Sequence, residues 1–152
     1  MINNDQPIRL ALLSDVLEDL QAGAEKQIYQ LISHLDSSRY QVFVLSLNPA
    51  SESTQQLIRS AGCELKIFRV VRIYGISGLV QGIRFMRFLK TNRIQILQTY
   101  HFGSDIWGTF WAHLAGVRHI VSNRRDMGFW RKSVHLMAYK FINRWVHTVI
   151  AV

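Results

Sequence analysis

Two neighbouring segments, Ile8–Ser14 (IRLALLS) and Leu20–Lys26 (LQAGAEK), indicate the fold class of this sequence. The first is a continuous apolar run with one arginine, which is typical of a central parallel strand that is buried on both faces. The second contains three small residues, Ala22, Gly23 and Ala24, just before an amphipathic segment. A small-residue turn between a strand and a helix either binds phosphate or merely reverses the chain. Both roles are open at this point.

The rest of the chain repeats the alternation of apolar runs and helical patterns. Helices between successive strands predict right-handed crossovers and a parallel sheet that is covered on both faces. We therefore expect an α/β, Rossmann-like three-layer sandwich with a mainly parallel sheet, in one domain over residues 1–152. The patterns predict strands at Ile8–Ser14, Gln41–Leu47, Cys63–Phe68, Ile94–Thr99, His119–Asn123 and Thr148–Val152, and helices at Ala24–Leu35, Ser51–Ala61, Gly78–Lys90, Asp105–Ala115 and Trp130–Val146.

Composition narrows the class of protein. A hydrophobic fraction of 49% and an aromatic fraction of 11% indicate a globular chain. The single cysteine, Cys63, excludes an internal disulfide and any multi-cysteine metal site, and it reads as a small buried hydrophobe. The first ten residues lack the pattern of a signal peptide, and no apolar run is long enough to span a bilayer. We expect a cytoplasmic protein without a bound metal.

Charge is distributed unevenly along the chain. Lysine and arginine number 18 against 10 acids, and Asp105 and Asp126 are the only acids after Arg69. A basic C-terminal half indicates an anionic partner: a phosphorylated molecule, an acidic membrane face or a nucleic acid. Nucleic acid is disfavoured, because the aromatic residues follow helical stripes and not an exposed sheet face on which bases could stack.

Several nucleotide-binding classes are excluded by missing residues. The dinucleotide fingerprint needs three glycines and an acid after the second strand, whereas LQAGAEK has one glycine and the second strand ends in SLNP. The sequence contains no phosphate-binding loop of the G-x-x-x-x-G-K-[ST] type. A phosphoacceptor receiver domain would carry an acid after the third strand, where this chain has Phe68 and Arg69.

The loop DVLEDLQAGAEK, the helix that follows it and the strand YQVFVLSL resemble the start of a GT-B glycosyltransferase. The similarity is to the large retaining group that includes sucrose and glycogen synthases and many bacterial polysaccharide and lipid-linked sugar transferases. It continues in order through AGCELKIF, through ILQTYHFGSDIWGTFWAHLAGVRHIVSNRRDMGFW and through RWVHTVIAV, and it covers essentially the whole chain.

The resemblance implies a domain organisation and an activity. Such enzymes have two Rossmann-like domains facing a cleft, and residues 1–152 correspond to the N-terminal, acceptor-side domain. The C-terminal donor-binding domain, with its E-x7-E motif, lies outside this sequence, in which Glu64 is the last glutamate. The complete enzyme would transfer a sugar from a nucleotide-sugar to a saccharide, polysaccharide or lipid-linked acceptor with retention, without a metal or cofactor. This fragment alone would be inactive.

The resemblance also implies binding residues. The backbone at Gly23 and Ala24 would approach the donor diphosphate, and His101 would line the acceptor side of the cleft. The alternatives are an unoccupied turn and a structural histidine. Ser104 or Asp105 is expected to cap the following helix through its side chain.

Arg124, Arg125 and Asp126 follow the fifth strand. In many family members this position reads T-x-H-D, so Arg125 takes the place of the active-site histidine and Asp126 is kept. An arginine does not act as a general base near neutral pH, but its guanidinium binds phosphate or carboxylate. We therefore expect Arg124 and Arg125 to bind an anionic donor or acceptor. The alternative is a surface arginine pair bridged to Asp126.

Two further interpretations stay open. The segment Trp130–Val146 places Val134, Met137, Ala138, Phe141 and Trp145 on one stripe, which either packs on the sheet or, with basic neighbours, contacts the inner face of a membrane. Gly78–Arg93 is the other candidate for such a peripheral contact. The alternative function is a non-catalytic α/β module that binds an anionic, phosphorylated ligand.

Overall fold

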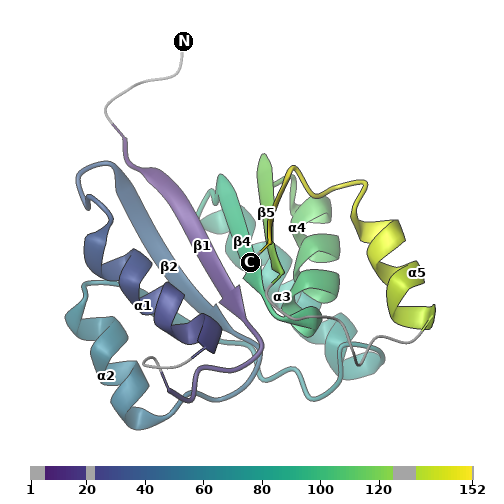
Figure 1. Ribbon diagram of the computed structural model, residues 1–152, viewed down its shortest axis with the longest axis horizontal. Helices are drawn as coiled ribbons and strands as arrows, with labels where there is room; N and C mark the ends of the chain where they lie inside the picture. The colour runs from purple at the N-terminus through teal and green to yellow at the C-terminus, as the bar shows by residue number, and fades with distance from the viewer. Residues whose placement is uncertain (1–5, 20–22, 125–132, 152) are drawn as a thin grey trace.

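Six parallel strands form one sheet in the order β3-β2-β1-β4-β5-β6 (Figure 1). The computed structural model describes residues 6–19, 23–124 and 133–151. Every pairing between neighbouring strands is parallel, as the alternating pattern predicts. The strands are β1 (Ile8–Ser14), β2 (Tyr40–Ser46), β3 (Glu64–Ile67), β4 (Ile96–Tyr100), β5 (His119–Arg124) and β6 (Thr148–Ala151).

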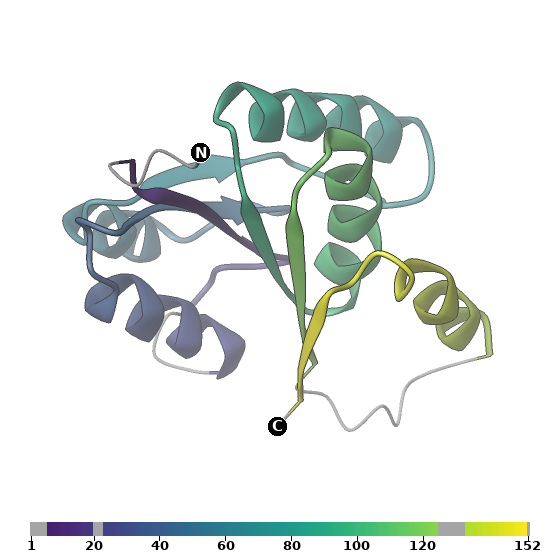
Figure 2. The same ribbon diagram turned by 90° about the horizontal axis from the view of Figure 1, so that it is seen from above.

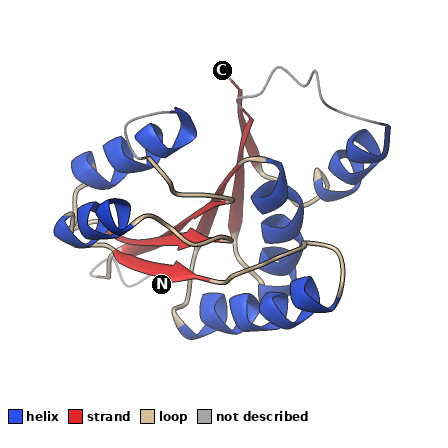
Figure 3. Cartoon of the chain, turned by 90° about the horizontal axis from the view of Figure 1, so that it is seen from below, coloured by secondary structure: helices blue, strands red, loops and turns tan. Residues whose placement is uncertain are grey.

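Helices cover both faces of the sheet, as seen along its edge in Figures 2 and 3. One face carries α1 and α2 over β1 to β3, and the other carries α3 and α4. This arrangement confirms the predicted α/β, Rossmann-like layers. The helices are α1 (Gly23–His34), α2 (Glu52–Ser60), α3 (Ile76–Thr91), the π-helical turn η1 (Ser104–Gly108), α4 (Thr109–Ala115) and α5 (Ser133–Ile142).

The central strand β1 divides the core into two clusters. Leu10 and Leu12 pack with the buried stripe of α1, whereas Ala11 and Leu13 point to the opposite cluster under α3 and α4. Alternate residues of a strand point to opposite faces, so a strand buried on both faces must be apolar throughout. This is why the uninterrupted run IRLALLS forms the middle of the sheet.

Apolar spacing predicts a buried face of α3 formed by Leu79, Ile83, Met86 and Leu89, and the structure confirms the last three, which pack in the core cluster. Leu79, however, is 55% exposed, and Gly78 and Gly82 are buried instead. A side chain at Gly82 would collide with the Trp111 ring of α4, and Trp107 Nε1 donates to Gly78 O at 3.0 Å. The two glycines let α4 approach closely, and this contact sets which side of α3 is buried.

The last helix also differs from its prediction. α5 ends at Ile142, before the predicted end at Val146, and residues 130–132 lie outside the described part of the chain. Tyr139 and Ile142 are its buried residues, and they pack on Phe102 and Ile106. The predicted stripe therefore does not face the sheet. Three of its members are exposed: Val134, Met137 and Phe141.

Gly82→Ala tests the close contact between α3 and α4. Its Cβ would lie 1.9 Å from the Trp111 ring, and overpacking of this kind costs about 1–3 kcal/mol, which outweighs a helix-propensity gain of at most about 1 kcal/mol. We expect the Tm, followed by circular dichroism, to fall by roughly 5 °C. Thr91→Ala, an exposed change in the same helix, is the control and should not lower the Tm. An unchanged Tm in Gly82→Ala would contradict this packing.

Candidate functional site

The switch point of the sheet, where the strand order changes direction, lies between β1 and β4. The chain proceeds outward from β1 to β3 on one side and from β4 to β6 on the other. The loops that follow β1 and β4 therefore diverge at the carboxyl edge of the sheet, where open α/β sheets bind their ligands. The predicted residues at this edge come from the start of α1 and from the ends of β4 and β5.

Asp15 joins the loops that follow β1 and β4. Its carboxylate accepts hydrogen bonds from the backbone N–H groups of Gly103, at 2.9 Å, and of Ser104. A Cβ at Gly103 would lie 2.6 Å from Asp15 Oδ2, so the approach requires glycine. The expected capping by Ser104 or Asp105 is therefore wrong. Asp15 binds the first amides of the helical segment, and the Ser104 hydroxyl donates back to the carbonyl of Tyr100.

His101 lies directly after β4, at the switch point. Its backbone has a φ of +74°, which turns the chain sharply away from the strand. Its Nδ1 lies 3.1 Å from Ser14 Oγ, and that hydroxyl donates to Val16 O at 2.7 Å. Ser14 therefore accepts from Nδ1–H, which leaves Nε2 as the acceptor of the neutral ring. The role of His101 toward a ligand stays a prediction.

Gly23 and Ala24 have different environments at the start of α1. Gly23 is exposed and has a φ of +59°, in the left-handed region that glycine adopts without strain. Ala24 is buried, and its methyl group packs in the cluster that includes Ile28. Gly23 therefore lies at the surface, where a Cβ would be 3.2 Å from Glu25 Oε2, whereas the Ala24 side chain belongs to the core.

Arg124, the last residue of β5, is held by several neighbours. Its Nε donates to Ser122 Oγ at 3.0 Å and lies 3.5 Å from Asp105 Oδ2, and its terminal nitrogen donates to Asn143 Oδ1. The guanidinium also lies over the Tyr139 ring, 4.4 Å from its centre. These contacts fix Arg124 between β5 and α5. Its neighbours Arg125 and Asp126 lie outside the described residues.

Asp105 is the buried acid at the centre of this network. Its carboxylate accepts from Thr99 Oγ1 of β4 and from Ser122 Oγ of β5, the latter at 2.7 Å. Burial raises the pKa of Asp105 above its ordinary value of 3.8, and the hydrogen bonds from Ser122 and Thr99 and the charge of Arg124 oppose that rise. One carboxyl group thus connects η1 to two strands and orients Arg124.

Asp15, Asp105 and Tyr139 were not predicted to organise this edge. Asp15 could have been found from its position, because it directly follows the central strand, where parallel strands present their ligands. Nothing in the helical spacing around Asp105 or Tyr139 distinguishes a buried network from an ordinary helix face. Within the described residues, no three His, Cys, Asp or Glu side chains lie close enough together to bind a metal ion.

The fold resembles one half of several solved GT-B enzymes. HepE of Anabaena, solved in complex with UDP and glucose, is 14% identical with a TM-score of 0.68, over 91% of this chain and 37% of its own. MurG of Acinetobacter baumannii is 12% identical with a TM-score of 0.67, over 96% of this chain and 41% of its own. Sucrose-phosphate synthase of Thermosynechococcus elongatus is 13% identical with a TM-score of 0.60, over 93% of this chain and 41% of its own.

These similarities define the class of fold, which is a Rossmann-like half of a GT-B structure. The chain spans about two fifths of the length of the structures it matches. The sequence model of the glycosyl transferase 4-like domain matches residues 22–152. The chain belongs to this glycosyltransferase family, as the resemblance in its sequence indicates. No curated protein gives a significant sequence match.

Asp105→Asn tests the electrostatics of the buried network. A raised pKa in the folded protein means that stability is greatest below the unfolded pKa and falls as the pH rises through the folded pKa. Asparagine does not ionise, so the variant avoids this loss. The free energy of unfolding of the variant, measured relative to that of wild type in urea titrations, should therefore increase between about pH 4 and pH 7.

Asp36→Asn is the control, because the pKa of Asp36 is shifted in the opposite direction. The Ser38 hydroxyl and N–H groups lower the pKa of Asp36, so its stabilising effect is present above the unfolded pKa and is lost as the pH falls. This variant should lose stability relative to wild type as the pH rises to about 4, and the difference should then stay nearly constant up to about pH 7. A pH-independent difference for Asp105→Asn would contradict the assigned environment.

Proposed function

We propose that residues 1–152 form the acceptor-side half of a glycosyltransferase that transfers a sugar from a nucleotide-sugar to a saccharide, polysaccharide or lipid-linked acceptor, with retention of the anomeric configuration. The observation that carries this proposal is the family match over residues 22–152 together with the open carboxyl edge at the β1/β4 switch point. A donor-binding domain supplied by further sequence would complete the cleft, since the related structures are more than twice as long.

Two described residues at this edge support binding of a diphosphate donor. Gly23 is exposed at the N-terminus of α1, where the helix dipole favours an anion. Arg124 brings a fixed positive charge to the end of β5, and Arg125 is proposed to provide a second one to the leaving diphosphate. Stabilisation of a departing diphosphate by such groups needs no metal or cofactor.

His101 is proposed to face the acceptor. With Nδ1 bonded to Ser14 Oγ, Nε2 is the ring nitrogen left to contact a hydroxyl group of the acceptor at the carboxyl end of β4. The family position of Arg125, where a histidine is common, gives no base, so Arg125 and Asp126 are proposed to act in binding and charge stabilisation rather than in proton transfer.

We further propose that the enzyme works at the inner face of a membrane through α5. Val134, Met137 and Phe141 are exposed along this helix, Met137 to 71%, and Lys140 and Arg144 are exposed beside them. Apolar side chains flanked by lysine and arginine are typical of helices that lie on anionic bilayers. Within the described residues, none of the helices has the length and apolar character needed to cross a bilayer.

Donor binding is tested by calorimetry with UDP-glucose, UDP-N-acetylglucosamine and GDP-mannose on the longest polypeptide that the gene encodes around these residues. Gly23→Ala adds a methyl group where the diphosphate would approach, and the loss of one hydrogen bond should weaken binding about tenfold. Gly62→Ala is the matched control, because Gly62 also has a positive φ (+74°) but follows α2. Equal losses in the two variants would indicate backbone strain alone. Binding of phosphate without any nucleotide-sugar would favour the non-catalytic module.

The membrane contact is tested by co-sedimentation with vesicles that contain phosphatidylglycerol. Met137→Glu removes the proposed apolar contact with the bilayer and adds a charge that anionic lipid repels, so binding should fall about tenfold or more. Leu57→Glu makes the same kind of change at an exposed residue of α2 and should leave binding unchanged. Equal binding by wild type and Met137→Glu would exclude α5 as the contact.

A further inference from the structure

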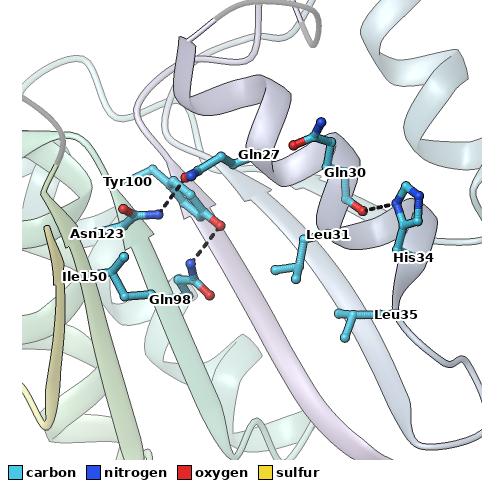
Figure 4. A pocket seen from close by; sticks show the side chains of 9 residues that line it. All are labelled: Gln27, Gln30, Leu31, His34, Leu35, Gln98, Tyr100, Asn123 and Ile150. Carbon is cyan, nitrogen blue, oxygen red and sulfur yellow. Dashed lines mark hydrogen bonds between the residues drawn. The ribbon is translucent and has the colours of Figure 1, made fainter. Parts of the chain in front are cut away.

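A pocket lies between α1 and the half of the sheet that α1 does not cover. Its volume is about 630 Å³, and its walls come from α1, β4, β5 and β6. Figure 4 shows Gln27 and Leu31 of α1 on one side and Gln98, Asn123 and Ile150 of the three strands on the other. The pocket reaches the carboxyl end of β5, next to the candidate functional site.

The sheet changes from apolar to polar along this face. In the row of paired residues that crosses the sheet, Leu65, Val44 and Leu12 occupy β3, β2 and β1, but Gln98 occupies β4. In the next row on the same face, Asn123 occupies β5 beside Tyr100 of β4. An apolar helix packed here would bury these amides without hydrogen-bond partners, at a cost of about 1–3 kcal/mol each. The uncovered part of the sheet is therefore built for a polar occupant.

Asn123 lies in the pocket wall near the end of β5 and is bonded to α1. Its side chain is 4% exposed, and Nδ2 donates to Gln27 Oε1 at 3.0 Å, while Oδ1 has no hydrogen-bond partner within the described residues. Turning the amide over would leave Nδ2 in place of Oδ1 without a partner. The Oδ1 atom is itself shielded from solvent, so Asn123 contributes to the pocket wall through its amide nitrogen, which connects β5 to Gln27 of α1.

The chemistry of the walls restricts the ligand to a neutral molecule with several hydroxyl groups. Among the described residues that line the pocket there is no Asp, Glu, Lys or Arg, and His34 is the one basic side chain. The amides of Gln27, Gln98 and Asn123 can each donate and accept, as a sugar hydroxyl does. Leu31 and Ile150 offer aliphatic surface to the C–H face of a sugar ring. These described lining residues include no lysine or arginine to bind a phosphate.

We propose that this pocket binds a neutral sugar unit of the acceptor, with Gln27, Gln98 and Asn123 as its hydrogen-bonding residues. Assignment of the sugar to the acceptor rests on the proposed function, whereas the sugar-binding chemistry of the pocket does not. The donor phosphate and the acceptor sugar then occupy different surfaces, one at the basic strand ends and one in an uncharged pocket on the α1 face of the sheet.

The test is saturation-transfer-difference NMR on the 152-residue chain with the methyl glycosides of glucose, galactose, mannose and N-acetylglucosamine, and with glucose 6-phosphate as the charged comparator. Wild type should give signal from at least one methyl glycoside and less from glucose 6-phosphate. Gln98→Leu and, independently, Gln27→Leu keep the side-chain volume and remove an amide, so each should weaken binding about tenfold. Gln56→Leu, at an exposed position of α2, is the matched control and should bind as wild type does.

Absence of signal from all four glycosides, a preference for glucose 6-phosphate, or equal signal from Gln98→Leu and wild type would each overturn the proposal. The proposed function is judged separately by nucleotide-sugar calorimetry on the longer polypeptide. Donor binding without glycoside signal would refute the pocket and leave the function standing. Glycoside signal that depends on Gln98, without donor binding, would leave a sugar-binding pocket and refute the glycosyltransferase.

Discussion

The carboxylate of Asp15 is the contact on which the arrangement of the candidate site depends. It follows the central strand and accepts the first backbone amides of the helical segment after β4, so it fixes the two diverging loops of the switch point to each other. The close approach requires Gly103, and it sets where the chain leaves β4. His101, with its left-handed backbone, and the π-helical turn that contains Asp105 are both positioned by this bond. Asp105 in turn connects Thr99 and Ser122 and orients Arg124.

The fold could be predicted because its signal is local. IRLALLS has the uninterrupted apolar character of a doubly covered strand, and the structure gives β1 the same bounds, Ile8–Ser14. The alternation of strands and helices then requires parallel pairing. Helix faces were less predictable, since they depend on neighbours far along the chain. Leu79 is exposed because Gly78 and Gly82 bring α4 against the other side of α3.

Only the location of the candidate site could be predicted from the sequence. Strand order places His101 and Arg124 at the carboxyl edge, but the partner of each side chain depends on tertiary contacts that periodicity does not encode. Ser104 and Asp105 have the right residue types for a helix cap, yet the nearby Asp15 provides the cap and burial turns Asp105 toward the strands. The amide-lined pocket was not foreseen, because Gln27, Gln98 and Asn123 meet only when α1, β4 and β5 are assembled.

We propose that this domain, which belongs to the glycosyl transferase 4-like family, is part of an enzyme that transfers sugar from a nucleotide-sugar. The most direct measurement is release of nucleoside diphosphate from UDP-glucose, UDP-N-acetylglucosamine or GDP-mannose by the longest polypeptide that the gene encodes, with a heat-treated extract of the source cells as acceptor. The account predicts release from one of these donors that depends on both the polypeptide and the extract. No extract-dependent release from any of the three donors would contradict it.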